Sequence, residues 1–464
     1  MTLIKSISGI RGTIGGKVNG NLTPIDIVKF TSSYGEFIKN KNFNKNNLKI
    51  IVGRDARISG EILNSLIINT LLSLSFEVVD LGLSTTPTVE MAVVKHKANG
   101  GIILTASHNP REWNALKLLN EKGEFLSAKE GEFILEIAEK EDFNFSKIDF
   151  LGKKTFYKNS INDHIDEILK LELVDISLIK KANFHVVIDA VNSTGGIALP
   201  LLLEKLGVKK IEKLYCEPNG EFPHNPEPIP ENLTEISKVI IEKNADIGFV
   251  VDPDVDRLAI VCEDGSMFGE EYTLVAVSDY VLQNKKGNTV SNLSSTKALK
   301  DITEKYNCNY FSSAVGEVNV VEMMKNKNAV IGGEGNGGII YPELHYGRDA
   351  ILGIALFLTF LAKENIKCSE LRSKYPNYFI SKNKIKLNEK INTNEILKKI
   401  YDIYKNKNLE ISLIDGVKIN FENSWVHLRK SNTEPIIRIY SESKSKKESE
   451  MLSEKIINEI KKIL

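Results

Sequence analysis

The segment IGFVVDPDVDRLAIV, residues 247–261, places Asp252, Asp254 and Asp256 between two short apolar runs rich in β-branched residues. Such runs predict buried strands, and at alternate positions of an extended chain the three carboxylates point the same way. Uncompensated, they would repel one another, and an all-oxygen set favours a hard cation, Mg²⁺ or Ca²⁺. An EF-hand is disfavoured because Arg257 stands where that loop needs glycine. The segment predicts a metal-binding turn, with a metal-free solvated loop as the alternative.

On both sides of this segment, short apolar runs that predict strands alternate with stretches whose apolar residues recur at the spacing of an amphipathic helix. This alternation is typical of βαβ units and of mixed or parallel sheets, so the expected fold class is α/β. The expected strands are Lys49–Val52, Phe76–Asp80, Gly101–Leu104, His185–Ile188, Ile247–Val251, Leu258–Val261 and Ala329–Ile331. The expected helices include Pro24–Ile38, Ser59–Leu74 and Asn232–Lys243.

Three stretches, at residues 139–158, 252–257 and 365–382, indicate domain boundaries. We expect four domains of the usual size range, the first three of which could share one topology. The expected domains are residues 1–152, 153–256, 257–370 and 371–464. The last is expected to be a smaller α+β domain, with strands near Lys384–Leu387, Gly416–Phe421, Trp425–Arg429 and Ile436–Tyr440 and a closing helix Lys446–Leu464.

The composition argues against several classes of protein. With 61 Lys+Arg against 61 Asp+Glu, the chain lacks the basic excess of a nucleic-acid or membrane-surface binder. Its longest apolar run, Ile351–Ala362, is shorter than the about 20 residues that a membrane-spanning helix needs. The N-terminus lacks the apolar core of a signal peptide, and the four cysteines form no CxxC pair. We expect a cytoplasmic protein, monomeric or homodimeric, that binds neither nucleic acid nor a membrane.

Arginine is rare in this chain, since only nine of its 61 basic residues are arginine. Where lysine is the usual cation, a retained arginine indicates a need for the planar guanidinium, which binds phosphate or carboxylate through two hydrogen bonds. Most of the nine lie in or beside segments rich in Gly, Asp or Ser. As a set they favour a binding site for anions, although any single one could belong to a surface ion pair.

A second segment, TASHNP at residues 105–110, follows an expected strand and predicts a turn that presents the hydroxyl of Ser107. A nearby cation could activate that hydroxyl to accept or donate a phosphoryl group. His108 could orient or polarise the reacting group, and Lys117 could hold charge or transfer a proton. The alternative is a tight turn capped by the serine.

The glycine-rich segment GGEGNGG, residues 332–338, contains G-x-G-x-x-G but is followed by IIYP rather than a helix. A dinucleotide site is therefore rejected. One carboxylate and one amide, Glu334 and Asn336, beside Gly337 suit sugar hydroxyls, which need both donors and acceptors. A plain turn is the alternative.

Two further segments predict phosphate binding. RKSNTEP, residues 429–435, followed by Arg438, gathers arginines, hydroxyls, an amide and backbone N–H groups at a strand end. Its other interpretation is a capped helix start, because Ser-Asn-Thr-Glu resembles a capping box. Near the N-terminus, Arg11 lies between Gly9 and Gly12. Glycines allow the backbone to approach an anion closely, so this segment could also bind phosphate. Its other interpretation is an ordinary turn.

Together these five segments resemble the α-D-phosphohexomutase superfamily, in the same order and over essentially the whole chain. Each motif alone is modest, but five in order are highly specific. The resemblance implies four domains around a central cleft, three with mixed α/β sheets of similar topology. It also implies an enzyme that moves phosphate between the 1- and 6-positions of a hexose through a hexose 1,6-bisphosphate, which also serves as primer.

The resemblance further implies a role for each candidate residue. Ser107 would be the phosphorylated serine, and its phosphate oxygen would bind Mg²⁺ together with Asp252, Asp254 and Asp256. The acid/base or orienting groups would be His108 and Lys117, with Arg257 and Arg11 nearby. The residues implied to bind the sugar phosphate are Glu334, Asn336 and Gly337 for the hydroxyls and Arg429, Ser431, Asn432, Thr433 and Arg438 for the phosphate.

The sugar loop departs from the superfamily pattern, which is commonly Glu-x-Ser-Gly-His, because here it is EGNGG from Glu334. Asparagine can replace the serine contact, and His345 is a candidate substitute for the missing histidine. The stretch Gly332–Asp349 is similar to a branch described as phosphoglucosamine mutases. It favours glucosamine 6-phosphate and glucosamine 1-phosphate as substrates, with glucose and mannose phosphates as alternatives.

Two other classes of function are considered. A sugar-phosphate phosphatase could use the same serine and aspartates, but a hydrolase has no need for the second phosphate site at residues 429–433. A non-catalytic relative would not need the serine and the three aspartates, all of which are present.

Overall fold

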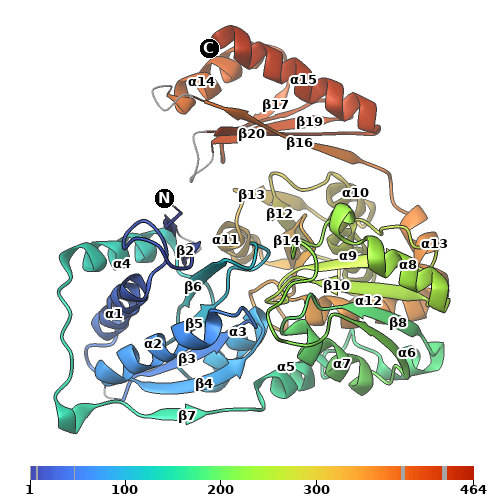
Figure 1. Ribbon diagram of the computed structural model, residues 1–464. Helices are drawn as coiled ribbons and strands as arrows, with labels where there is room; N and C mark the ends of the chain where they lie inside the picture. The colour runs from blue at the N-terminus through green and yellow to red at the C-terminus, as the bar shows by residue number, and fades with distance from the viewer. Residues whose placement is uncertain (1, 7–8, 46, 388–391, 431–435) are drawn as a thin grey trace.

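The computed structural model describes residues 2–6, 9–45, 47–387, 392–430 and 436–464, which form four units with one sheet each (Figure 1). The first unit has a seven-stranded sheet in the order β1-β2-β6-β5-β3-β4-β7. Its strands are β1 Ile4–Ser6, β2 Gly9–Thr13, β3 Lys49–Arg54, β4 Glu77–Leu83, β5 Gly100–Leu104, β6 Trp113–Leu119 and β7 Lys154–Phe156. Its helices are α1 Pro24–Lys41, α2 Gly60–Ser73, α3 Thr86–Lys95 and α4 Ala128–Lys140.

The second and third units each have a four-stranded sheet. The second contains β8 His185–Asp189, β9 Lys210–Leu214, β10 Ile247–Val251 and β11 Leu258–Cys262, with helices α5 Ser160–Ile168, α6 Ile176–Ala182, α7 Gly195–Lys205 and α8 Thr234–Lys243. The third contains β12 Asn288–Asn292, β13 Tyr310–Ser313, β14 Ala329–Glu334 and β15 Gly338–Ile340, with helices α9 Glu270–Asn284, α10 Ala298–Lys305, α11 Glu317–Lys327, α12 Ala350–Glu364 and α13 Cys368–Ser373.

These three units share one topology, as the sequence and the resemblance led us to expect. In each, the first strand pairs in parallel with the second and third, and the fourth returns antiparallel to the third. The first unit adds β2 and β1 at one edge of this core and β7 at the other. The serine, aspartate and glycine-rich motifs therefore lie in equivalent turns, each of which joins the third parallel strand to the antiparallel strand.

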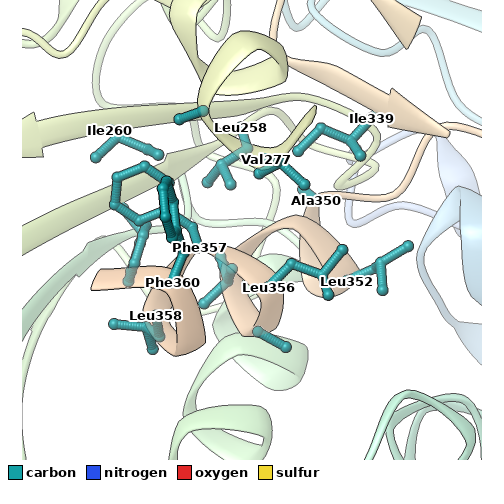
Figure 2. Packing of buried hydrophobic residues seen from close by; sticks show 14 of the residues in the cluster. Leu258, Ile260, Val277, Ile339, Ala350, Leu352, Leu356, Phe357, Leu358 and Phe360 are labelled. Atoms are coloured by element: carbon teal, nitrogen blue, oxygen red, sulfur yellow. The ribbon is translucent and has the colours of Figure 1, made fainter. Parts of the chain in front are cut away.

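The second and third units share a hydrophobic core, which fixes their turns relative to each other. Helix α12 is buried along most of its length and packs against β11, β15 and α9 (Figure 2). Phe357 and Phe360 lie beside Ile260 of β11 in this cluster, while Ala350, at the start of α12, lies toward Ile339 of β15. A helix that is apolar all round is typical of the centre of a large core.

The fourth unit is an antiparallel sheet in the order β16-β20-β19-β18-β17 with its own core (Figure 1). It meets the third unit through polar contacts, including His427 Nδ1 to Ser294 Oγ at 2.9 Å and Lys418 Nζ to the Leu293 carbonyl at 2.7 Å. Its elements are β16 Phe379–Lys386, β17 Glu410–Ser412, β18 Val417–Asn420, β19 Trp425–Lys430, β20 Ile436–Ser443, α14 Thr393–Tyr404 and α15 Lys446–Ile463. No helix in the described parts of the chain is long and apolar enough to cross a membrane.

Two of the differences from the sequence-based expectations concern the candidate site. Strands β2 and β6, which carry Arg11 and Lys117, were not expected as strands. The boundary expected after Asp256 falls in the turn between β10 and β11, which pair along their whole length in one sheet. This turn is therefore internal to the second unit, because its polar residues belong to a hairpin rather than to a linker.

Candidate active site

The serine turn and the aspartate turn meet at the junction of the first two units. The hydroxyl of Ser107, after β5, donates a hydrogen bond to Oδ2 of Asp252, after β10, at 2.6 Å. The Thr86 hydroxyl donates to Oδ2 of Asp254 at 2.6 Å. Residues more than a hundred positions apart in the sequence are thus in direct contact, and the predicted pairing of the serine with the aspartates is present.

The aspartates converge because the chain turns, and the expectation of an extended segment was wrong. The amides of Asp256 and Arg257 both donate to Oδ1 of Asp252 at 3.1 Å. Val255 adopts φ 62°, a left-handed conformation that is unfavourable for a β-branched residue. The turn, rather than strand alternation, brings the side chains of Asp252, Asp254 and Asp256 together.

The three aspartates fit a divalent cation. They are fully buried, and one oxygen of each lies within 4.8 Å of the others. Oδ1 of Asp254 and Oδ1 of Asp256 have no hydrogen-bonding partner among the described residues. Burial, together with repulsion from Asp256 and Asp254, raises the pKa of Asp252 well above its ordinary value. Carboxylate oxygens held together without hydrogen-bond donors are the kind of ligand set that Mg²⁺ prefers.

Lys117 on β6 faces the aspartates as a permanent cation. Its Nζ lies 2.6 Å from Oδ2 of Asp254 and 3.4 Å from Oδ2 of Asp256. Burial opposes the charge, but the two carboxylates outweigh it and raise the pKa of Lys117. An ammonium held in this state can neutralise charge or donate a proton, but it is a poor base.

His108 lies next to the serine as a neutral imidazole. Its Nδ1 is 3.5 Å from the Ser107 hydroxyl. Burial and the charge of Arg257 lower the pKa of His108 well below its ordinary value. A neutral ring can accept a proton or donate a hydrogen bond beside the reacting hydroxyl.

Arginines from the first, second and fourth units carry charges that act on one another. Burial and the charges of Arg438 and Arg257 lower the pKa of Arg11. The Nε atoms of Arg11, Arg257 and Arg429 are buried without a hydrogen-bonding partner among the described residues. Arg429 and Arg438 are paired across β19 and β20. Buried guanidinium nitrogens without an acceptor are suited to bind an anion such as a phosphate. The other expected phosphate ligands, Ser431, Asn432 and Thr433, lie outside the described residues.

Both carboxylate oxygens of Glu334, in the sugar loop, accept hydrogen bonds from the protein. Oε1 of Glu334 accepts hydrogen bonds from Asn292 Nδ2 at 2.8 Å and the Gly316 amide at 3.1 Å. Its Oε2 accepts one from Arg348 Nη1 at 2.9 Å. Asn336 is partly exposed and accepts one from the Gly338 amide.

The glycine expected beside the sugar has a packing role. Gly337 has φ +83°, and a Cβ there would lie 2.3 Å from the carbonyl oxygen of Leu258 in β11. The Leu258 amide also donates to the Gly337 carbonyl at 3.1 Å. Gly337 therefore allows the sugar loop to approach the strand that follows the aspartate turn.

Arg348, which was not among the expected site residues, joins the sugar loop to the aspartate turn. Its guanidinium donates to Glu317 at 3.0 Å, Glu334 at 2.9 Å and Asp256 at 2.7 Å. A Cβ at Gly338 would lie 2.3 Å from Cδ of Arg348, so the glycine leaves room for this side chain. The scarcity of arginine in the chain was the only signal that could have singled it out.

Arg57 is a second positioning residue that the sequence analysis did not select. It is 1% exposed, and its Nε donates to Asp55 at 3.0 Å. Its guanidinium also donates to the backbone carbonyl oxygens of the serine turn, those of Ser107, Asn109, Pro110 and Trp113, at 2.5, 2.6, 2.7 and 3.0 Å. These bonds fix a turn in which Ser107 itself has φ 48°.

His345, the candidate substitute for the loop histidine, faces another group of residues. Its Nδ1 lies 3.2 Å from Oε2 of Glu90 and its Nε2 lies 3.3 Å from Oδ2 of Asp349. Burial opposes the charge, but these carboxylates raise the pKa of His345 to about 10. The guanidinium of Arg348, rather than this imidazole, contacts the carboxylate of the sugar loop.

Four family models match consecutive parts of the chain. Three are described as phosphoglucomutase/phosphomannomutase alpha/beta/alpha domains I, II and III, and they match residues 3–145, 162–265 and 269–378. The fourth, the phosphoglucomutase/phosphomannomutase C-terminal domain, matches residues 382–459. The second match includes both strands that flank the aspartate turn.

Similar proteins are found over nearly the full length. A Thermococcus kodakarensis protein named phosphoglucomutase/phosphomannomutase is 35% identical over 442 residues, 94% of this chain and 95% of its own. A Sulfurisphaera tokodaii protein named phosphoglucosamine/phosphogalactosamine mutase is 34% identical over 469 residues, 98% of each chain. The crystal structure of a Burkholderia thailandensis phosphoglucomutase/phosphomannomutase family protein has the same fold, with a TM-score of 0.84, 22% identity and coverage of 99% and 98%. The chain therefore belongs to the phosphoglucomutase/phosphomannomutase family and is a phosphohexomutase, an isomerase that transfers phosphoryl groups.

Proposed function

We propose that this protein interconverts glucosamine 6-phosphate and glucosamine 1-phosphate through a phosphoserine at Ser107 and a 1,6-bisphosphate intermediate. The observation that carries the proposal is the contact of the Ser107 hydroxyl with Asp252, inside a buried triad with unpartnered oxygens. A serine held against ligands for a hard cation and near several arginines is suited to carry a phosphoryl group.

In the first half-reaction, the free hydroxyl of the sugar monophosphate attacks the phosphorus of phosphoserine. The P–O bond to Ser107 breaks, the hydroxyl proton is taken up by a nearby group, and a 1,6-bisphosphate and free serine result. After the bisphosphate turns around, Ser107 attacks its other phosphate and the isomeric monophosphate leaves. The phosphoenzyme is regenerated, so no phosphate is gained or lost.

The residues near the serine suit these steps. His108, held neutral, would take the proton from the attacking hydroxyl, and Lys117 would supply positive charge. Asp252, Asp254 and Asp256 would hold Mg²⁺ with a phosphoserine oxygen, and the bound ion supplies Lewis-acid stabilisation of the phosphoryl oxygens. Arg11 and Arg257, whose charges act on His108, would supply positive charge beside the phosphoserine. Arg429 and Arg438, with Ser431, Asn432 and Thr433, would bind the phosphate that is not being transferred. Glu334 would position the sugar through its loop and Asn336 through direct contact.

Two observations support the choice of an amino sugar. The EGNGG loop and the segment up to Asp349 resemble phosphoglucosamine mutases, and the Sulfurisphaera tokodaii relative carries that activity in its name. The Thermococcus kodakarensis relative, named for glucose and mannose phosphates, supports the alternative substrates. Small-molecule sugar phosphates are the proposed partners in either case, and the cytoplasm is the proposed compartment.

The deciding experiment compares kcat/KM for glucosamine 6-phosphate, glucose 1-phosphate and mannose 1-phosphate, each with Mg²⁺ and the matching bisphosphate. A preference of about 100-fold for the amino sugar, or about 2.7 kcal/mol, is expected. Equal or faster turnover of glucose or mannose phosphate would contradict the proposed preference for the amino sugar, but it would not contradict the mutase activity.

The phosphoserine is tested separately by intact mass and by Ser107→Ala. We expect a phosphorylated species in the wild-type protein that is absent from the variant, with activity reduced by at least about a thousandfold. Ser84→Ala is the matched control, because Ser84 is buried and its hydroxyl has no partner among the described residues. Substantial turnover by Ser107→Ala would contradict the phosphoserine.

A further inference from the structure

A second group of metal-ligating side chains lies apart from the aspartate turn. It combines His164 of α5 with His345 and Asp349 of the segment between β15 and α12. Nε2 of His164 is 2.8 Å from Oδ2 of Asp349, and Nε2 of His345 is 3.3 Å from the same oxygen. Neighbouring ligands around one tetrahedral ion with bonds of about 2.0–2.2 Å lie about 3.4 Å apart. The second separation is close to this value, and the first is the shorter one of a hydrogen bond.

Each of these three side chains is oriented by a contact of its other polar atom. Nδ1 of His164 lies 3.0 Å from the hydroxyl of Thr88 in α3. Oδ1 of Asp349 accepts the first amides of α12, those of residues 351 and 352, at 2.9 and 3.1 Å. Nδ1 of His345 lies 3.2 Å from Oε2 of Glu90 in α3. Metal-binding histidines are usually held in this way by an outer partner on the second ring nitrogen.

Glu90 provides an independent observation. Its side chain is 2% exposed, yet neither carboxylate oxygen has a partner of hydrogen-bonding geometry among the described residues. A buried carboxylate without such partners requires a compensating positive charge nearby. Without a metal, a proton on His345 supplies part of this charge, since its pKa is raised to about 10. When both imidazoles are neutral as metal ligands, Glu90 and Asp349 together carry two negative charges, which one divalent ion would balance.

We propose that His164, His345 and Asp349 bind a late first-row divalent ion of the Zn²⁺ class, with Glu90 as the outer partner of His345. Two imidazoles favour such an ion over Mg²⁺ or Ca²⁺, which take oxygen ligands. Three protein ligands leave a fourth position for water. The ion would join α5 to the segment before α12, next to α3 (Figure 1).

This ion would have a positioning role rather than a catalytic one. Asp349 directly follows Arg348, whose guanidinium joins the sugar loop to the aspartate turn. Fixing Asp349 on both its oxygens would therefore fix the backbone from which Arg348 extends. The proposal does not depend on which hexose phosphate is the substrate.

The experiment titrates Co²⁺ into the full-length protein, stripped of metal and then saturated with Mg²⁺. Visible absorption of Co²⁺ in a four-coordinate site with nitrogen ligands is expected, at about one equivalent per chain, and Zn²⁺ should abolish it. His345→Gln and His164→Gln should remove the absorption, and Glu90→Gln should weaken Co²⁺ binding by about 10- to 100-fold. Asp252→Asn, in the aspartate turn, is the matched control and should retain the band.

Several outcomes would overturn the proposal. Absence of the band in folded wild-type protein would mean that protons, not a metal, hold these imidazoles and carboxylates together. Persistence of the band in folded His345→Gln, or its loss in Asp252→Asn, would place the ion elsewhere. Circular dichroism establishes folding of each variant, and the wild-type titration decides the matter if a histidine variant fails to fold.

Discussion

The aspartate turn between β10 and β11 and the sugar loop between β14 and β15 occupy the same position in two sheets of one topology. Their carboxylates are nevertheless used in opposite ways. Asp254 and Asp256 each keep one buried oxygen without a partner among the described residues, whereas both oxygens of Glu334 accept hydrogen bonds. The number of donors that the protein supplies therefore distinguishes a carboxylate that awaits a ligand from one that holds a loop.

One side chain connects the two turns and partly explains their difference. Arg348 gives one nitrogen to Glu334 and another to Asp256. Glu334 also receives two uncharged donors, so both of its oxygens have hydrogen-bonding partners within the protein. The aspartate turn shares Lys117, one nitrogen of Arg348 and a longer contact from Arg257 among three buried carboxylates. It thus retains negative charge that a divalent ion can neutralise.

The largest effect is expected for Asp252→Asn. Because burial and the neighbouring carboxylates raise the pKa of Asp252, a neutral amide should remove a desolvation cost and relieve repulsion, leaving the metal-free protein at least as stable. Activity should fall by at least about a thousandfold, or about 4 kcal/mol. The increase in melting temperature that Mg²⁺ gives the wild-type protein should be absent from this variant.

Asp279→Asn is the matched control for this change. Asp279 is a buried carboxylate that accepts hydrogen bonds from Tyr306 and Tyr375, away from the aspartate turn. This variant should lose stability and keep its response to Mg²⁺. A marked loss of metal-free stability in Asp252→Asn would instead show that the aspartate turn, like the sugar loop, has all its charges satisfied by the protein.

A smaller effect is expected for Arg348→Met, which separates the two turns. Loss of the guanidinium leaves three buried carboxylates without a shared donor, and breaking buried pairs of this kind costs about 3–5 kcal/mol of stability. We expect kcat/KM to fall by about a hundredfold. Mg²⁺ should bind more tightly, because a competing cation has left Asp256.

Arg372→Met controls for the loss of a partly buried arginine elsewhere. Arg372 donates to the Phe268 carbonyl and stacks on Tyr272, with no contact to either turn. Its Mg²⁺ affinity, measured by calorimetry, should equal that of the wild type. If Arg348→Met also left Mg²⁺ affinity and kcat/KM unchanged, the connection between the turns would have no functional role.

The resemblance to a known superfamily predicted that Ser107 would lie with the aspartates, and its hydroxyl does contact Asp252. Apolar runs before Ser107 and Asp252 indicated the strand ends that carry them. The predicted elements near the site are present, and their bounds mostly differ by one to three residues. The spacing of the three aspartates predicted a common direction, but the turn with Val255 in a left-handed conformation produces it.

Long-range contacts of single side chains could not be predicted in this way. Arg57 contacts carbonyl groups about fifty residues away, and Arg348 contacts an aspartate 92 residues away. No local pattern records such pairs, because each depends on how whole sheets pack. Strand β6 was missed for a related reason, since Lys117 interrupts its apolar pattern and is buried only because the aspartates lie opposite.

The smallest effect on activity, and the sharpest test of the comparison, is expected for Glu334→Gln. The amide keeps the shape and one acceptor for Asn292 and Gly316 but loses the charge that pairs with Arg348. A hydrogen bond to a charged group is worth about 1.5–3 kcal/mol, so stability should fall by about that amount. Mg²⁺ affinity should stay near the wild-type value, and kcat/KM should fall by about tenfold.

This result would be the reverse of that for Asp252→Asn, in which activity and metal response are lost while stability is kept. The double variant Glu334→Gln with Arg348→Met should be less destabilised than the sum of the single variants, by about 1–3 kcal/mol, because both remove the same ion pair. Additive losses would mean that the two side chains act independently. Glu334 would then be free to contact sugar hydroxyls directly, and the two turns would differ less than their hydrogen bonds indicate.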